Sequence, residues 1–137
     1  MTKQIWLNLP VKEVVESKEF FTKIGFSFNE QYATPQSTCL SVGTTHFAVM
    51  LFAEAMFEGF VRNKITDTQS SSEVLISIDA ESREEVDEFA KKVEEAGGVV
   101  FSKPAEIQRW MYGCGFTDLD GHRWNMLYMD FSKVQKQ

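Results

Sequence analysis

The feature that most constrains the fold of this chain is an internal repeat. Residues of the first half match residues 72 positions later in the second half: Val14 with Val86, Phe21 with Val93, Gly25 with Gly97, and Phe28 with Val100. At an offset of 76, His46-x-x-x-Met50-Leu51 recurs as His122-x-x-x-Met126-Leu127. Half of a 137-residue chain is marginal as an independent domain, which favours two similar modules within one domain.

Each half predicts the element order β-α-β-β-β. Alternating apolar residues and turn residues place the strands, and apolar residues three or four positions apart place the helices. The first half gives strands at 5–9, 26–28, 39–42 and 46–52, with helices at 13–23 and 54–60. The second half gives strands at 74–78, 99–102, 112–117 and 122–128, with a helix between Ser82 and Gly97. Ser82 and Glu85 have the spacing of a capping box at the start of that helix.

The domain organisation follows from this order. We predict a single domain, residues 1–137, with module one at about 1–61, a polar linker at about 62–72 and module two at about 73–131. The fold class is α+β: two βαβββ modules form a cupped mixed sheet with helices outside, around a small-molecule cavity.

Charge and cysteine content narrow the classes of function. The net charge of −6 argues against nucleic-acid binding and against docking on an anionic membrane. Residues 1–11 lack the long apolar stretch of a secretion signal, and no apolar run reaches the length that spans a bilayer. Cys39 and Cys114 stand far apart without a Cys-x-x-Cys motif. Reduced thiols in a cytoplasmic protein are therefore expected, rather than a disulfide framework or a cysteine metal site.

Two motifs carry a resemblance to a known superfamily. Asn8-Leu-Pro-Val-Lys-Glu13, followed by Ser17-Lys-x-Phe-Phe and Ile24-Gly-Phe26, resembles the first module of the vicinal oxygen chelate superfamily. Thr117-Asp-Leu-Asp-Gly-His-Arg-Trp-Asn125 resembles its final hairpin. This superfamily includes glyoxalase I, extradiol dioxygenases, fosfomycin-resistance enzymes and bleomycin-binding proteins, and the likeness is strongest to predicted lactoylglutathione lyase-like proteins.

The resemblance implies a set of metal-ligand positions, which this chain does not fill with the usual residues. Enzymes of the superfamily usually hold a divalent metal in the cup through His, Glu, His and Glu. Those positions fall on Trp6, on Val49 (or Met50 if the register slips by one), on Glu73 and on Asn125. A catalytic zinc site normally has three protein ligands, usually with imidazole among them. We therefore expect no metal cofactor, with a divalent metal as the less favoured alternative.

The same positions define the candidate ligand-binding residues. Residues two apart on a strand share a face, so Trp6 and Asn8 would line the cup together, as would Asn125 and Leu127. Glu73 is the candidate catalytic residue: either a carboxylate in the cup that acts as a base or holds a cation, or a solvated residue at a strand end. Trp6 either lines the cavity or belongs to the core, and residues 109–114 either close over a ligand or simply lead into a strand. The candidate ligand-binding set is Trp6, Asn8, Val49, Glu73, Asn125 and Leu127.

Two functions remain open. The first is a protein that binds a small cationic or aromatic molecule without transforming it, as the bleomycin-binding branch does. The second is an enzyme, either a lyase or dioxygenase with a degenerate metal site or a metal-free enzyme with Glu73 as base. The set of residues at the ligand positions favours the first. The resemblance and the need to cover sheet edges also predict a homodimer.

Overall fold

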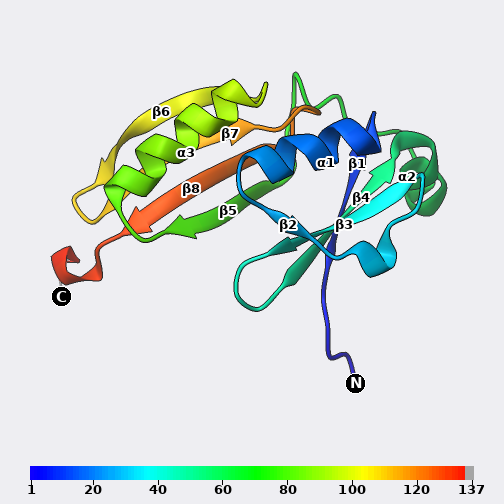
Figure 1. Cartoon of the computed structure of the whole chain (residues 1–137), viewed down its shortest axis with the longest axis horizontal. Helices are drawn as coiled ribbons and strands as arrows, with labels where there is room; N and C mark the ends of the chain where they lie inside the picture. The colour runs from blue at the N-terminus through cyan, green and yellow to red at the C-terminus, as the bar shows by residue number, and fades with distance from the viewer. Residues whose placement is uncertain (135–137) are drawn as a thin grey trace. The chain divides into compact units, whose positions relative to one another are not determined.

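The computed structural model describes residues 1–134, which form two compact units (Figure 1). The first unit is Met1–Asp67, and the second begins at Thr68. The boundary lies within the segment 62–72 that the sequence assigns to a linker. Each unit has the predicted β-α-β-β-β order and its own mixed four-stranded sheet, so the α+β class with two βαβββ modules is confirmed.

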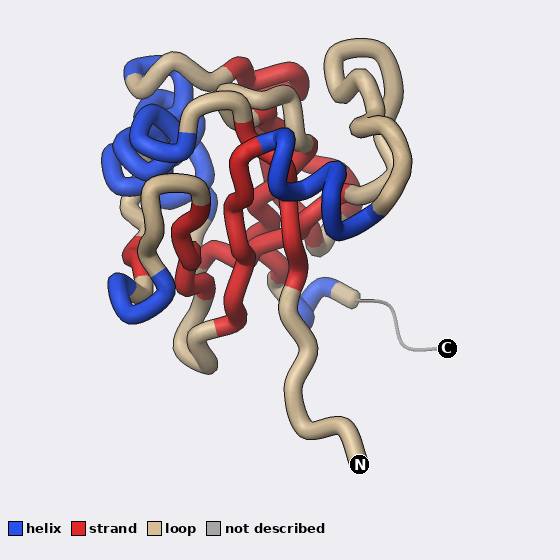
Figure 2. The backbone as a smooth tube through the Cα atoms, turned by 90° about the vertical axis from the view of Figure 1, so that its right-hand side faces the viewer, coloured by secondary structure: helices blue, strands red, loops and turns tan. Residues whose placement is uncertain are grey.

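The first unit is a mixed sheet with the strand order β1-β4-β3-β2. Strand β1 runs parallel to β4, and the other neighbouring pairs are antiparallel. Residues 1–6 form a loop that leads away from the sheet (Figure 2). The elements are β1 (Leu7–Val11), α1 (Val14–Lys23), β2 (Ser27–Phe28), η1 (Glu30–Tyr32), β3 (Ser37–Val42), β4 (Phe47–Ala53) and α2 (Glu54–Val61).

Strand alternation gives this sheet one largely apolar, buried face. Leu9 pairs with Leu51, and Leu40 pairs with Val49, so all four side chains lie on the same side of the sheet. These four residues and Phe20 and Phe21 of α1 are buried, which makes this face the core of the first unit.

The second unit repeats the arrangement with the order β5-β8-β7-β6. Strand β5 is parallel to β8, and the other neighbouring pairs are antiparallel. None of the helices within residues 1–134 is long and apolar enough to cross a membrane. The elements are β5 (Leu75–Ala80), α3 (Arg83–Glu95), β6 (Val99–Gln108), β7 (Met111–Thr117), β8 (Arg123–Met129) and η2 (Phe131–Lys133).

Helix α3 covers one face of the second sheet. Its predicted apolar stripe, which includes Val86 and Phe89, is buried. The Phe89 ring meets the Phe116 ring edge-on at 5.2 Å, and Phe116 stacks on Trp124 at 6.0 Å. Trp124 is completely buried, so the face of β8 that carries Trp124 and Met126 belongs to the core.

The capping box at the start of α3 is present with one change of partner. The Ser82 hydroxyl accepts a hydrogen bond from the Glu85 backbone N–H at 3.1 Å, as predicted. The Glu85 carboxylate accepts from the backbone N–H of Glu81 at 2.7 Å, rather than from that of Ser82.

Two predicted strand ends are wrong. The predicted strands at 5–9 and 99–102 end shortly before prolines, yet β1 and β6 both continue through Pro10 and Pro104. Both strands are outer strands of their sheets, where a residue without an N–H can turn its nitrogen away from the ladder. His46 also does not open a strand: it lies in the turn before β4 with a positive φ of 56°.

Candidate functional site

The face of the second sheet opposite α3 holds the residues of most chemical interest. Because Trp124 and Met126 point toward the core, Arg123 and Asn125 point to the other side. The pairing of β8 puts Gly115 of β7 and Ser77 of β5 beside Asn125 on that side. This open face therefore combines two polar side chains with a glycine that leaves space above the strand.

A hollow of ≈ 340 Å³ lies on this face, entirely within the second unit. Its volume is within the range of small-molecule pockets. It is lined by Ser72, Glu73, Val74, Leu75, Phe101, Ser102, Ile107, Gly113, Cys114, Gly115, Arg123 and Asn125.

A layered contact between Gly115, Phe101 and Arg123 forms one wall of the hollow. A β-carbon at position 115 would lie only 2.6 Å from two ring atoms of Phe101, so the ring packs directly on the glycine backbone. The Arg123 guanidinium carbon lies 4.4 Å from the centre of the same ring. Such a cation–π contact holds the guanidinium in a defined position.

Two buried polar atoms of lining residues have no hydrogen-bond partner within the described residues. These are the Nε atom of Arg123 and the Oδ1 atom of Asn125. Buried polar groups in folded proteins are almost always paired, so two unpaired atoms in one hollow call for a partner that the chain itself does not supply.

Glu73 lies at the rim of the same hollow. It occupies a bend two residues before β5 and its side chain is exposed. The structure thus brings Glu73 and Asn125 to one hollow. Leu127 shares the open face of Asn125 and packs over Gly113, where an added β-carbon would lie 2.6 Å from Leu127 Cδ2.

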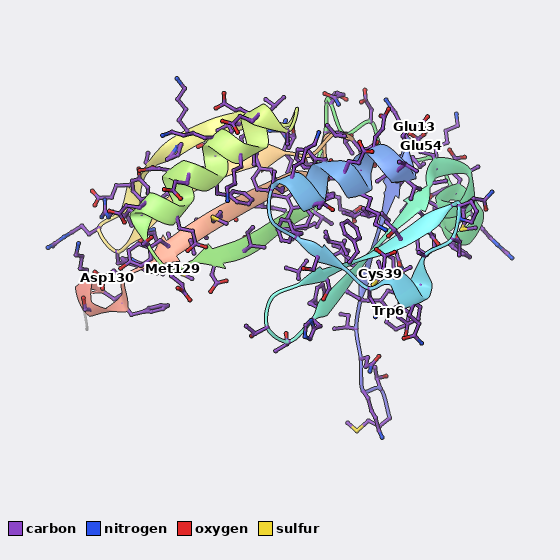
Figure 3. The ribbon with its side chains drawn as sticks, in the orientation of Figure 1. Trp6, Glu13, Cys39, Glu54, Met129 and Asp130 are labelled. Atoms are coloured by element: carbon purple, nitrogen blue, oxygen red, sulfur yellow. The ribbon has the colours of Figure 1, made fainter. Side chains whose placement is uncertain are left out.

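The remaining candidates belong to the first unit. Asn8 points away from the core face, since its neighbours Leu7 and Leu9 lie on that face. Trp6, which is labelled in Figure 3, directly precedes β1. It is 55% exposed. Val49 is completely buried in the core, whereas Met50 pairs with Asn8 and shares its face. Of the two alternatives for this ligand position, Met50 is the one on the face opposite the core.

Comparison with solved structures relates both units to known proteins. The chain resembles hypothetical protein SA1046 from S. aureus, with 31% sequence identity, coverage of 93% of this chain and 94% of that one, and a TM-score of 0.83. The chain belongs to the same protein family as SA1046. A glyoxalase/bleomycin resistance protein/dioxygenase family enzyme from Burkholderia phytofirmans PsJN has 17% identity, coverage of 90% and 96%, and a TM-score of 0.78.

A third structure, the fosfomycin resistance protein FosX from Listeria monocytogenes, has 14% identity, coverage of 93% of both chains and a TM-score of 0.67. Together these likenesses show that this relative of SA1046 has the glyoxalase/bleomycin resistance/dioxygenase fold. No protein-family model and no curated protein matches the chain.

The residues at the metal-ligand positions that the resemblance implies do not suit a divalent ion. These positions carry Trp6, Val49 or Met50, Glu73 and Asn125, so Glu73 is the one carboxylate of the set. Within residues 1–134, no three His, Cys, Asp or Glu side chains are grouped as metal ligands. Hard divalent ions prefer several carboxylates, and zinc prefers imidazole or thiolate, so the donor set fits neither.

The cysteines and histidines of this SA1046 relative lie outside the chemistry of the hollow. Burial raises the pKa of the Cys114 thiol, which disfavours the thiolate form, and it raises the pKa of Cys39 in the same way. Cys114 contributes to the lining, but its residue is almost completely buried. His46 is hydrogen-bonded to the Ser41 hydroxyl at 3.0 Å, and His122 is buried in the turn before β8.

Sequence reasoning missed Arg123 and Phe101. Arg123 was detectable, because it stands two residues before Asn125 on one strand and must share its face. Gly113 and Gly115 were also a signal, because two glycines two residues apart leave one face of a strand without side chains. Phe101 directly follows Val100, which pairs with Phe116 of the core face, so alternation places Phe101 on the open face. The sequence does not show that its ring packs on Gly115.

A second hollow, of ≈ 560 Å³, lies in the first unit between α1 and the segment that leads into β3. Its lining includes Thr38, whose hydroxyl is buried without a partner within the described residues. Lys18 at its rim is already paired with Glu30 at 2.6 Å. None of the candidate residues lines this hollow, so the one in the second unit is the stronger candidate site.

Proposed function

We propose that this protein binds a small organic molecule in the hollow of its second unit, without a metal. The observation that carries the proposal is the pair of unpaired buried atoms, Arg123 Nε and Asn125 Oδ1, in an otherwise largely apolar hollow. Small-molecule sites have this composition: apolar walls supply affinity, and a few polar groups orient the ligand. The glyoxalase/bleomycin resistance/dioxygenase fold supports the proposal, since the relative FosX is by its name a resistance protein against a small molecule.

An enzymatic function is the second candidate, favoured by one observation. Glu73 and Asn125 line the same hollow, as the alternative with Glu73 as a base requires. Such an enzyme would be a lyase or dioxygenase of this fold, and lactoylglutathione lyase-like activity is one form of it. The exposed position of Glu73 makes this the weaker candidate, because a general base is more effective in a desolvated site.

Two further proposals concern assembly and location. We propose a homodimer, since each sheet ends in outer strands that a second copy could cover. We also propose a cytoplasmic location, in keeping with two buried cysteines that are both free.

We predict that the purified protein contains no stoichiometric transition metal. The reason is the donor set at the metal positions, which offers one carboxylate and one amide beside side chains that bind hard ions poorly. Elemental analysis of freshly purified protein measures this directly. A content near one Zn, Ni, Mn or Fe per chain would contradict the prediction.

The ligand site itself is tested with three aromatic probes of similar shape: benzoate, benzamide and benzamidine. They are titrated into the isotope-labelled full chain up to about 10 mM, which detects binding free energies of only a few kcal/mol. At least one probe is expected to shift the backbone amide signals of Gly113, Gly115 and Asn125 more than those of the first unit. If all three probes leave these signals unchanged, the proposal fails.

A further inference from the structure

We infer that the ligand of the hollow is an organic anion, and that Arg123 binds its carboxylate or an equivalent acidic group. This inference rests on the proposed function and adds the charge and shape of the ligand to it. It differs from the expectation drawn from sequence, which considered a cationic ligand because Glu73 was the one charged group then assigned to the site.

The first step is the fixed position of the Arg123 side chain. The side chain is half-buried on the open face of β8, and its guanidinium lies over the Phe101 ring at 4.4 Å. The ring in turn packs on the Gly115 backbone, where a larger residue would collide with it. A cation that is already held in place loses little side-chain freedom when it binds an anion, so the hollow is preorganised for one.

The second step is the missing counter-charge. Within residues 1–134, no carboxylate forms an ion pair or hydrogen bond with Arg123, and its guanidinium rests on the ring of Phe101 instead. By contrast, Arg83, which is also half-buried, is paired with Glu106 at 2.7 Å. Removing a charge from water without pairing it costs free energy, so an anion that enters the hollow relieves a cost that the ligand-free protein carries.

The third step concerns the rest of the ligand. Asn125 Oδ1 is an acceptor without a donor within the described residues, so an N–H or O–H group of the ligand would satisfy it. Phe101, Ile107 and Leu75 supply exposed apolar surface around the polar groups, which suits an unsaturated or aromatic body. Glu73 at the rim disfavours a second negative charge. The ligand class is therefore a small, flat monoanion with one acidic group.

The experiment compares the affinities of benzoate, benzamide and benzamidine, which differ in charge at nearly constant shape. In the unmodified full chain, benzoate is expected to bind at least about tenfold more tightly than benzamide, since a charge-assisted hydrogen bond contributes that much or more. Benzamidine is expected to bind most weakly. This comparison needs no mutation and so does not depend on how a variant folds.

Arg123→Gln then tests the residue, with Arg83→Gln as the matched control of equal net charge. Arg123→Gln is expected to weaken benzoate binding about tenfold or more and to leave benzamide binding within about twofold. Arg83→Gln should leave the affinity for both probes unchanged. Arg123→Lys, which keeps the charge, should retain part of the benzoate affinity.

The outcomes separate the two proposals. If benzamide or benzamidine shifts the signals of the hollow and binds as tightly as benzoate, the anion inference is overturned while the proposed small-molecule site stands. If benzoate binds best but equally well to Arg123→Gln, Arg123 is not the anion-binding residue and the inference is overturned. If no probe binds in the hollow, the proposed function fails together with the inference.

Discussion

Replacing Asp118 with alanine is expected to lower the free energy of unfolding by about 3 kcal/mol, because three hydrogen-bond donors, two of them buried, lose their acceptor at once. Asp118 is 4% exposed and holds the turn between β7 and β8. Its Oδ1 atom accepts from the backbone N–H groups of Asp120 at 3.0 Å and His122 at 3.1 Å. Its Oδ2 atom accepts from the Trp124 indole at 3.1 Å. The side chain thus ties the turn to the largest residue of the second core.

Chemical denaturation of the full chain measures this effect. Asp118→Asn is the control, because it should lower the free energy of unfolding by less than Asp118→Ala does. Burial raises the pKa of the Asp118 carboxyl, while nearby His122 and the Trp124 hydrogen bond act in the opposite direction. Asparagine keeps one carbonyl acceptor for the two backbone donors and loses the acceptor for the indole. Its expected cost is therefore roughly half that of alanine. Equal stability of Asp118→Ala and the unmodified protein would contradict the role of this carboxylate.

Replacing Gly115 with alanine is expected to weaken benzoate binding by at least about tenfold. An added β-carbon would lie 2.6 Å from the Phe101 ring, so the ring must move away from β7. The displaced ring then no longer supports the Arg123 guanidinium, and it occupies part of the hollow. Because Phe101 is 46% exposed and free to move outward, the cost in stability should stay below about 2 kcal/mol.

Gly59→Ala in α2 is the matched control for this variant. It adds the same methyl group at a position where nothing lies within 4 Å of the new β-carbon. Benzoate affinity should remain within about twofold of that of the unmodified protein, since the hollow is untouched. If Gly115→Ala binds benzoate as tightly as Gly59→Ala does, the Phe101 wall is not part of the site.

Most of the fold could be predicted because its signals are local. The spacing of apolar residues along the chain identified the strands and the helices. The internal repeat indicated that the same topology occurs twice. Strand ends were less predictable, since Pro10 and Pro104 are tolerated only because β1 and β6 are outer strands, which is a property of the assembled sheet. The choice between Val49 and Met50 likewise depended on a register that the sequence left open by one residue.

The candidate site was predictable only in part. Resemblance to a superfamily pointed to Glu73 and Asn125, and both line the hollow. It could not point to Arg123, because this residue is not among the metal-ligand positions that the resemblance implies. The packing of Phe101 on Gly115 was not predictable, because it depends on the register between β6 and β7, which the apolar pattern does not show.

A crystal structure of the full chain with benzoate tests the central claim most directly. Benzoate is expected in the hollow of the second unit, with its ring beside Phe101 and its carboxylate on Arg123. Benzoate bound elsewhere with this hollow empty, for example between α1 and β3 of the first unit, would contradict the account.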